Sequence, residues 1–284
     1  MIVEELPERV REHVRNARRN GMRVGCVPTM GALHQGHCSL MERARRECDF
    51  VVSTIFVNPT QFLPGEDFTR YPRTLEADLR CCADSGVDLV FTPQTEHMYA
   101  ENAQTTVQPG KLAEVLEGVI RPGHFAGVTT IVAKLFAVTE PDVAYFGQKD
   151  FQQQLIIRQM VRDLKLPVEI VTCPIVREVD GLAMSSRNRY LSAAERDAAV
   201  ELSRALAEAS RLATESSLSS EEISEQMRNI LQSSGQLEVQ YAVLADPETL
   251  EYPLRRTSGG EAVGLIAVRL GTTRLIDNAL IRFS

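Results

Sequence analysis

Apolar runs alternate with amphipathic segments through the first 176 residues. Apolar runs that indicate strands occur at 22–27, 50–57, 87–91, 143–146 and 168–176. The run at 50–57 is continuous and rich in β-branched residues, which is typical of a strand buried on both faces, whereas Arg23 and Gly25 interrupt the first run and Pro174 breaks the last. Segments with helical spacing lie between and before them, at 7–20, 39–46, 75–83, 111–117, 128–138 and 151–164. This alternation predicts an α/β fold, a Rossmann-like doubly wound parallel sheet with helices on both faces.

The pattern changes after residue 176. Two capping-box signals, each a serine followed three residues later by a glutamate, predict helices to about 213 and 231; they are Ser192 with Glu195 and Ser219 with Glu222. Three strands follow at 237–244, 262–270 and 273–281, and Gly271-Thr272 is suited to a hairpin between the last two. We therefore expect a Rossmann-like domain at 1–176 and a smaller α+β domain at 177–284.

Composition and charge narrow the class of protein. The chain has 284 residues, 44% hydrophobic and 24% charged, as in ordinary globular proteins. Its net charge of −7 argues against a broad nucleic-acid or membrane surface, because both favour a basic face. No apolar run approaches the ~20 residues needed to cross a bilayer. The N-terminus lacks a basic segment followed by an apolar one, so no signal peptide is expected.

The six cysteines show neither a Cys-x-x-Cys pair nor a zinc-like spacing with histidine. We expect buried, reduced thiols and therefore a cytoplasmic protein.

Two glycines and two histidines lie where the first strand of the pattern passes into a helix. Gly31 and Gly36 let the backbone approach a ligand, and His34 and His37 can each donate a hydrogen bond to phosphate oxygen. Backbone N–H groups at a helix start are unpaired and partly positive, which makes such a place an anion site. A turn with two surface histidines is the alternative, and the His-x-Gly-His spacing favours the anion site.

Further donors follow other predicted strands. Lys149 comes after Gly147 and directly before a helix, which favours a polyanion, and Gln61 and Gln153 suit a hydroxylated substrate. The loop at 185–188 concentrates hydroxyl, guanidinium and amide donors that could close over phosphates. Taken singly, each of these residues could equally be an ordinary surface residue with no role in binding. Because ligands bind outside the carboxyl ends of parallel strands, we expect the motifs at 28, 58 and 147 to meet at one cleft.

Together these motifs resemble the pantothenate synthetase (pantoate–β-alanine ligase) family of the nucleotidylyl-transferase superfamily over nearly the whole chain. The matching segments are 27–37, 55–62, 71–74, 121–130, 146–153, 180–191 and 274–278. The resemblance implies ATP-dependent joining of pantoate to β-alanine through a pantoyl adenylate, with release of AMP and diphosphate. It also implies that 1–176 is the ATP- and pantoate-binding catalytic domain, that 177–284 closes over the active site, and that the protein is a homodimer.

The resemblance assigns roles to residues of this chain. The implied ATP site consists of Met30, Gly31, Ala32, Leu33, His34, Gln35, Gly36, His37, Gly147, Gln148, Lys149, Asp150, Val176, Met184, Ser185, Ser186 and Arg187. The implied catalytic residues are His37, which takes the position of the family's proton donor, with His34, Lys149 and Arg187. The substrate residues are Gln61 for pantoate and β-alanine, Gln153 for pantoate, and Asn58. Gln148 and Ala126 depart from the residues frequent in relatives, Glu and Arg.

The chemistry is consistent with these residues. Pantoate's carboxyl, with a pKa of about 3.5 to 4, is ionised near neutrality, so its attack on phosphorus needs no base. The site must instead supply positive charge, from the four catalytic residues and from Mg²⁺. Phosphates provide most ligands of Mg²⁺; Asp78 could contribute one, and a solvated helix carboxylate is the alternative. No strong base is evident for the amine step.

Other functions would retain some of these features. Another nucleotidylyl transferase would keep the histidine motif without a site for an amine substrate. A nucleotide-binding sensor would bind ATP without turnover. An aminoacyl-tRNA synthetase is disfavoured by the acidic balance and the short chain.

Overall fold

A computed structural model describes residues 1–255, 257 and 259–284. The chain forms two compact units. The first comprises Met1–Gln148 and Gln152–Pro174, and the second comprises Lys149–Phe151 and Ile175–Ser284.

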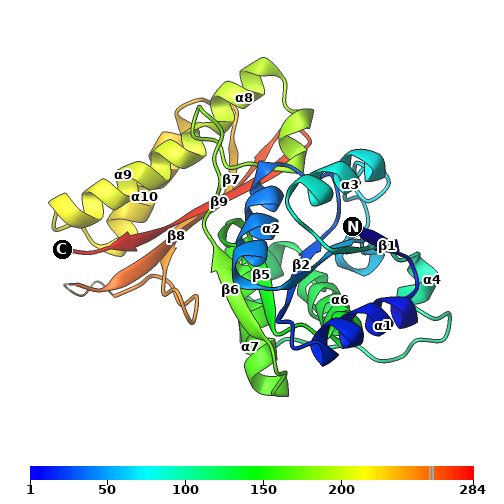
Figure 1. Cartoon of the computed structure of the whole chain (residues 1–284). Coiled ribbons are helices and arrows are strands. Elements are labelled where there is room, and N and C mark those ends of the chain that lie inside the picture. The colour runs from blue at the N-terminus through cyan, green and yellow to red at the C-terminus, as the bar shows by residue number, and fades with distance from the viewer. Residues whose placement is uncertain (256, 258) are drawn as a thin grey trace. The chain divides into compact units, whose positions relative to one another are not determined.

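The first unit is built on a six-stranded parallel sheet with the order β1-β4-β3-β2-β5-β6 (Figure 1). Its strands are β1 (Ile2–Glu4), β2 (Val24–Thr29), β3 (Phe50–Ile55), β4 (Leu89–Phe91), β5 (Val143–Gly147) and β6 (Glu169–Cys173). From β2 the chain proceeds to one side through β3 and β4, and later to the other side through β5 and β6. The predicted doubly wound parallel sheet is confirmed, and its switch point lies between β2 and β5. The three-residue strand β1, which pairs with β4, was not expected.

Helices cover both faces of this sheet. They are α1 (Pro7–Arg19), α2 (Gln35–Glu47), α3 (Leu75–Asp84), α4 (Thr95–Met98), α5 (Glu117–Ile120), α6 (His124–Thr139) and α7 (Phe151–Leu164), with 3₁₀ turns at η1 (Pro59–Gln61), η2 (Lys111–Ala113) and η3 (Gln148–Asp150). Side chains alternate along each strand, so Cys26 packs with α1, α6 and α7, whereas Val27 packs with α2 and α3. The helix expected at 111–117 is wrong: η2 and α5 are separate because Leu116 has a φ of +48°, which no helix accommodates.

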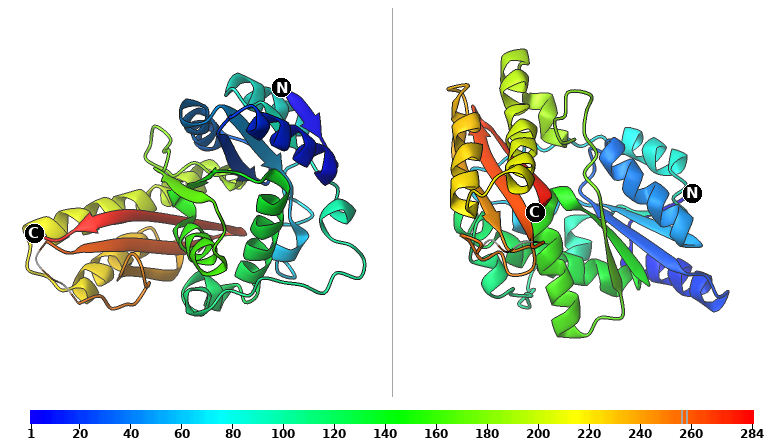
Figure 2. Two further views of the ribbon diagram at one scale, coloured as in Figure 1. Left: turned by 60° about the horizontal axis from the view of Figure 1, so that its bottom comes forward. Right: turned by 90° about the vertical axis from the view of Figure 1, so that its left-hand side faces the viewer.

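The second unit packs helices on an antiparallel sheet of order β7-β8-β9 (Figure 2). Its elements are η4 (Ser186–Tyr190), α8 (Ala193–Ala199), α9 (Glu201–Glu215), α10 (Ser220–Gln232), β7 (Glu238–Ala245), β8 (Glu261–Leu270) and β9 (Thr273–Arg282). Apolar residues of α9 and α10 form one core with the strands. Both capping boxes and the hairpin at Gly271 are confirmed. One expected helix is in fact two, α8 and α9, which meet at Val200.

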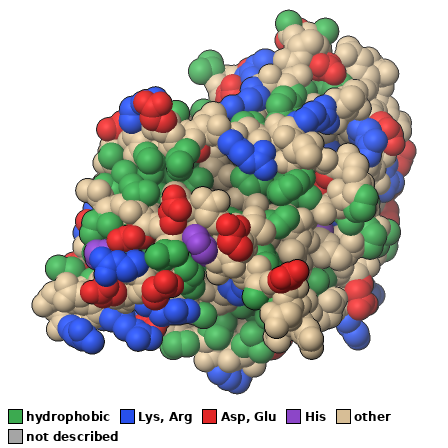
Figure 3. Space-filling model, turned by 90° about the vertical axis from the view of Figure 1, so that its right-hand side faces the viewer, with side chains coloured by type: hydrophobic (Ala, Val, Ile, Leu, Met, Phe, Trp, Pro, Cys, Tyr) green, Lys and Arg blue, Asp and Glu red, His purple; other side chains and the backbone are tan. Residues whose placement is uncertain are grey.

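None of the helices in the described ranges is both long enough and apolar enough to cross a bilayer. On the face drawn in Figure 3, acidic and basic side chains are interspersed with hydrophobic ones. That face therefore offers no broad basic area for nucleic acid.

Candidate active site

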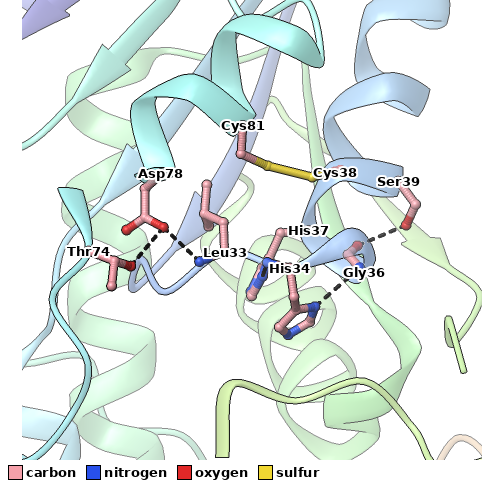
Figure 4. Close-up of a disulfide and its surroundings, with 9 residues drawn as sticks. All are labelled: Leu33, His34, Gly36, His37, Cys38, Ser39, Thr74, Asp78 and Cys81. Atoms are coloured by element: carbon pink, nitrogen blue, oxygen red, sulfur yellow. Dashed lines mark hydrogen bonds between the residues drawn. A yellow bond between two sulfur atoms is a disulfide. The ribbon is translucent and has the colours of Figure 1, made fainter. Parts of the chain in front are cut away.

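The loop from β2 to α2, residues 28–37, is here called the histidine corner. His34 has extended backbone and caps α2, and its Nδ1 accepts a hydrogen bond from the Gly36 N–H at 3.1 Å. In return, Nδ1 of His37 accepts from the His34 N–H at 3.3 Å. The two imidazole centroids lie 4.1 Å apart, side by side at the start of α2 (Figure 4). The two histidines thus form a reciprocal cap.

The capping bonds determine which ring nitrogen carries the proton. A nitrogen that accepts a hydrogen bond is unprotonated, so each neutral imidazole carries its proton on Nε2. Both rings are therefore in the tautomer that donates from Nε2. The expectation that the backbone amides of this corner are unpaired is wrong for His34 and Gly36, because the histidines themselves cap them.

The amides of Ala32 and Leu33 also have a partner within the protein, Asp78 on α3. Its two carboxylate oxygens accept from the Ala32 N–H at 3.0 Å and from the Leu33 N–H at 2.8 Å, and the Thr74 hydroxyl donates to it at 3.1 Å. Asp78 is only 2% exposed, so the expectation of a solvated carboxylate is wrong. The predicted magnesium role stays a prediction.

A disulfide joins α2 to α3, between Cys38 and Cys81, which are 43 residues apart in the sequence (Figure 4). The expectation of six reduced thiols is wrong for this pair. The other four cysteines are free and buried, namely Cys26, Cys48, Cys82 and Cys173. Sequence spacing gave no signal, because the two residues meet only when α2 and α3 pack on the same face of the sheet.

The turn after β3, residues 58–62, is here called the glutamine corner. Asn58 is 1% exposed, and its amide donates to Gln61 Oε1 at 3.1 Å and to the Gly127 carbonyl at 3.2 Å. The Asn58 oxygen accepts from the Tyr99 hydroxyl at 2.8 Å. Gln61 Nε2 in turn contacts Met30 Sδ at 2.9 Å. The structure therefore brings the two corners together, and the buried Asn58 orients Gln61.

A buried ionic group holds the backbone of Gln61. Nδ1 of His124 donates to the Gln61 carbonyl at 2.7 Å, which leaves Nε2 to accept from Arg121 Nη1 at 3.0 Å. Arg121 also pairs with both carboxylate oxygens of Glu66, at 2.6 and 2.7 Å. Arg121 and His124 lie in the segment 121–130, which resembles the family, but no role was predicted for them or for Glu66.

The pKa values of this group follow from its burial and pairing. Burial, with the positive charge of Arg121, lowers the pKa of His124 to about 4, so the ring is neutral at physiological pH. Burial alone would raise the pKa of the Glu66 carboxyl, but the hydrogen bond and charge of Arg121 outweigh it, and that pKa lies below its ordinary value. The group therefore carries one ion pair and one neutral imidazole.

Close backbone packing also fixes the glutamine corner. A Cβ atom on Gly127 would collide with the Thr60 carbonyl oxygen and would lie 2.8 Å from the Gln61 Cα. Only glycine allows α6 to approach η1 this closely. Glycine is therefore required at position 127 for a steric reason.

Of the three consecutive glutamines that begin α7, two are structural. Gln152 donates to the carbonyls of Leu112 and Val115, at 2.7 and 2.9 Å. Gln154 accepts from Arg158 at 2.7 Å. Gln153, the predicted pantoate residue, is half-buried between them.

The strand ends carry the motifs as expected, and the remaining predicted residues belong to the second unit. Gly147 ends β5, which neighbours β2 in the sheet, so the motifs after β2, β3 and β5 lie at one edge. Lys149 lies in η3, and its carbonyl accepts from Asn278 Nδ2 at 2.9 Å.

Hydrogen bonds of backbone groups define the conformation of the segment 176–187 in the second unit. The Val176 carbonyl accepts from the Met184 N–H at 3.0 Å and closes the loop that turns at Gly181, where φ is +93°. Ser185 caps η4 by accepting from the Arg187 N–H at 3.3 Å. This is a defined turn at the start of a short helix, in which Ser186 is buried.

Comparisons with known proteins agree along the whole chain. Residues 2–280 match the family model described as pantoate-beta-alanine ligase. A pantothenate synthetase of Moorella thermoacetica is 49% identical over 96% of this chain and 95% of its own length, and one of Thermoanaerobacter pseudethanolicus is 50% identical over 99% and 98%.

Solved structures agree with the sequence relatives. A pantothenate synthetase of Thermus thermophilus superposes with a TM-score of 0.92 at 46% identity, covering 98% of this chain and 99% of that one. The Francisella tularensis pantoate-beta-alanine ligase, solved with beta-gamma ATP and beta-alanine, gives 0.80 at 34% identity over 99% and 97%. The chain belongs to the pantoate-beta-alanine ligase family.

Proposed function

We propose that the protein joins pantoate to β-alanine at the expense of ATP, through a pantoyl adenylate, and releases AMP and diphosphate. Family membership over the whole chain supports this activity. The observation that carries it is the pair of reciprocally capped imidazoles that follows β2. The same loop contains Met30, whose Sδ contacts the Gln61 amide. Phosphate-binding donors and a substrate amide thus occupy neighbouring turns.

In the first step, a carboxylate oxygen of pantoate attacks the α-phosphorus of ATP, and the bond from that phosphorus to diphosphate breaks. The carboxylate is already ionised, so the protein need not remove a proton. His34 and His37 would donate hydrogen bonds from Nε2 to phosphate oxygens, while Lys149 and Arg187 would add positive charge. Met30, the backbone at 147–150 and 176, and the turn 184–187 would line the nucleotide.

In the second step, the amine of β-alanine attacks the acyl carbon of the adenylate, the bond from that carbon to AMP breaks, and the amine gives its proton to solvent. Gln61 and Gln153 would hold pantoate, and Gln61 would also meet β-alanine. The reactive mixed anhydride and positioning would supply the rate. A pH–rate profile of this step that requires a protein base near neutrality would contradict the proposal.

Mg²⁺ would enter with ATP and neutralise phosphate charge. In the described part of the chain, no group of three or more His, Cys, Asp or Glu side chains could hold a metal ion. Phosphate oxygens would therefore provide most ligands, as is usual for this ion. The resemblance further supports a cytoplasmic homodimer, which sedimentation velocity would test.

The decisive experiment measures pantoate-dependent exchange of diphosphate into ATP without β-alanine. We expect exchange with pantoate and Mg²⁺, and none when pantoate is omitted. Another nucleotidylyl transferase would exchange diphosphate only with its own acceptor and not with pantoate, and a sensor would bind ATP with no exchange at all. Either result would overturn the proposed function.

A further inference from the structure

Asp78 is a buried carboxylate without a basic partner in the described ranges. It is 2% exposed, and among the residues that the structure describes no Lys, Arg or His side chain pairs with it. Its charge is compensated by three hydrogen-bond donors, the amides of Ala32 and Leu33 and the Thr74 hydroxyl. A carboxylate held by consecutive backbone N–H groups is the arrangement in which a loop wraps an anion. Here the anion belongs to the protein.

The conformation of the loop depends on this carboxylate. Gly31 has a φ of +79°, and a Cβ there would lie 3.0 Å from the Asp78 oxygen, so the backbone passes directly over it. Ala32 follows with a φ of +50°, a region that residues other than glycine rarely adopt. Two adjacent left-handed residues persist only where the surroundings hold them. Asp78 holds the Ala32 amide, while the Gly31 N–H donates to the Thr29 hydroxyl at 3.2 Å.

The same loop leads directly to the histidines. Leu33, whose amide Asp78 holds, is followed by His34, the cap of α2. One turn after Asp78 on α3, Cys81 is bonded to Cys38, the residue after His37. Helix α3 therefore holds the histidine corner before the first histidine and after the second, as Figure 4 shows.

We propose that Asp78 is a positioning residue for adenylate formation, because its carboxylate fixes the backbone of Ala32 and Leu33 and thereby the place of the two imidazoles. This inference rests on the proposed function for its catalytic consequence and on the loop geometry for its structural one. It assigns Asp78 a role other than binding Mg²⁺, and the response of the variant to Mg²⁺ separates the two roles.

The test compares Asp78→Asn with Glu76→Gln. Asparagine keeps the shape but places an NH₂ group against a backbone N–H, so one of the two holding bonds is lost. Glu76 lies two residues earlier on α3 with a side chain 90% exposed, so its glutamine variant removes the same charge without touching the loop. We expect Asp78→Asn to lower kcat for pantoate-dependent exchange about 10²-fold at saturating Mg²⁺, with KM for pantoate changed less than about twofold. Glu76→Gln should stay within about twofold of the wild type.

Amide hydrogen exchange gives a readout that does not depend on activity. Asp78→Asn should speed exchange at the Ala32 and Leu33 amides about tenfold or more, while amides of β4 keep their wild-type protection. Unchanged protection of the Ala32 and Leu33 amides would overturn the positioning role. This holds even if the wild type showed no exchange of diphosphate into ATP. Absence of activity in the wild type would instead refute the proposed function alone.

Two further outcomes would decide between roles. If higher Mg²⁺ restored the activity of Asp78→Asn, Asp78 would be a metal ligand and the proposal would be wrong. If Asp78→Asn failed to fold, Thr74→Val would replace it, because it removes only the hydroxyl that supports the carboxylate. We expect a kcat about threefold to tenfold lower for Thr74→Val, as for the loss of one hydrogen bond, and a wild-type value would overturn the proposal.

Discussion

The histidine corner and the glutamine corner follow neighbouring strands, but they are held in different ways. The first is fixed by reciprocal caps between its own histidines, by a carboxylate on backbone amides and by a disulfide. The second is fixed through the Gln61 carbonyl by a neutral imidazole and a guanidinium paired with Glu66. Acid that protonates His124, near pH 4, can therefore disrupt a support of the second corner, whereas a reductant acts on the first.

The difference suggests how one sheet edge would serve the two ligands of the proposed function. Polyphosphate requires donors whose positions do not drift as charge builds, and covalent and backbone bonds provide that. A small hydroxy acid requires an amide in a fixed orientation, and buried side chains suffice to aim it. The four predictions below test this contrast.

The largest effect should come from the disulfide. Closing a loop of 43 residues stabilises a fold by about 4 kcal/mol in the chain-entropy model. We expect dithiothreitol to lower the free energy of unfolding by about that amount, measured by urea denaturation. The double variant Cys38→Ser/Cys81→Ser should show no response to dithiothreitol. Six rather than four free thiols in the unfolded, unreduced protein would contradict the bond.

Next comes the loss of a phosphate donor. We expect His37→Ala to lower pantoate-dependent exchange about 10²- to 10³-fold, as for removal of an oxyanion donor, and Lys149→Ala to lower it by about 10². His13→Gln is the control, because that imidazole pairs with Glu4 near the N-terminus. Exchange by His37→Ala at the wild-type rate would remove the residue from the mechanism.

Acid should weaken the support of the glutamine corner. The unfolded imidazole of His124 binds a proton below a pKa of about 6.5, but the folded one does so only near pKa 4. Unfolding therefore takes up a proton between these values, and stability is lost as the pH falls from 6.5 to 4, by up to about 3 kcal/mol. Urea denaturation at several pH values measures it. The slope should be smaller in His124→Asn, and an equal slope would assign the effect elsewhere.

The smallest effect concerns the hydrogen bond to Gln61. His124→Leu removes the donor to the Gln61 carbonyl, and we expect KM for pantoate to rise about tenfold, the equivalent of one hydrogen bond of ~1.4 kcal/mol. His124→Asn retains a donor near Nδ1 and should raise KM less than about threefold. KM for ATP should remain unchanged in both. Equal changes for the two substrates would mean that the corners are not independently supported.

The pattern of apolar and polar residues predicted those features of the fold that depend on residues close together in the chain. The long buried strands, both capping boxes and the hairpin at Gly271 followed from periodicity and turn chemistry. Strand β1 did not, because three residues carry no period, and their pairing with β4 is set by the sheet. The boundary between α8 and α9 at Val200 was not predicted either, since the residues on both sides are good helix formers.

For the candidate site, the sequence allowed residue types to be proposed, but it gave little information about the contacts between them. The histidines, Lys149 and Gln61 were proposed as site residues through spacing and family resemblance, and their roles stay predictions. The roles of Asp78 and His124 were not, because each acts on a backbone group 45 or more residues away. The pairing of Cys38 with Cys81 was missed for the same reason. What sequence reasoning missed was therefore the support of the site rather than its donors.

Asn278 holds the carbonyl of Lys149 across 129 residues of chain. During translation the lysine is thus made long before the strand that anchors it. A ribosome must extend β9 as far as Asn278 before this hydrogen bond can form, so the backbone of Lys149 gains its anchor only late in synthesis.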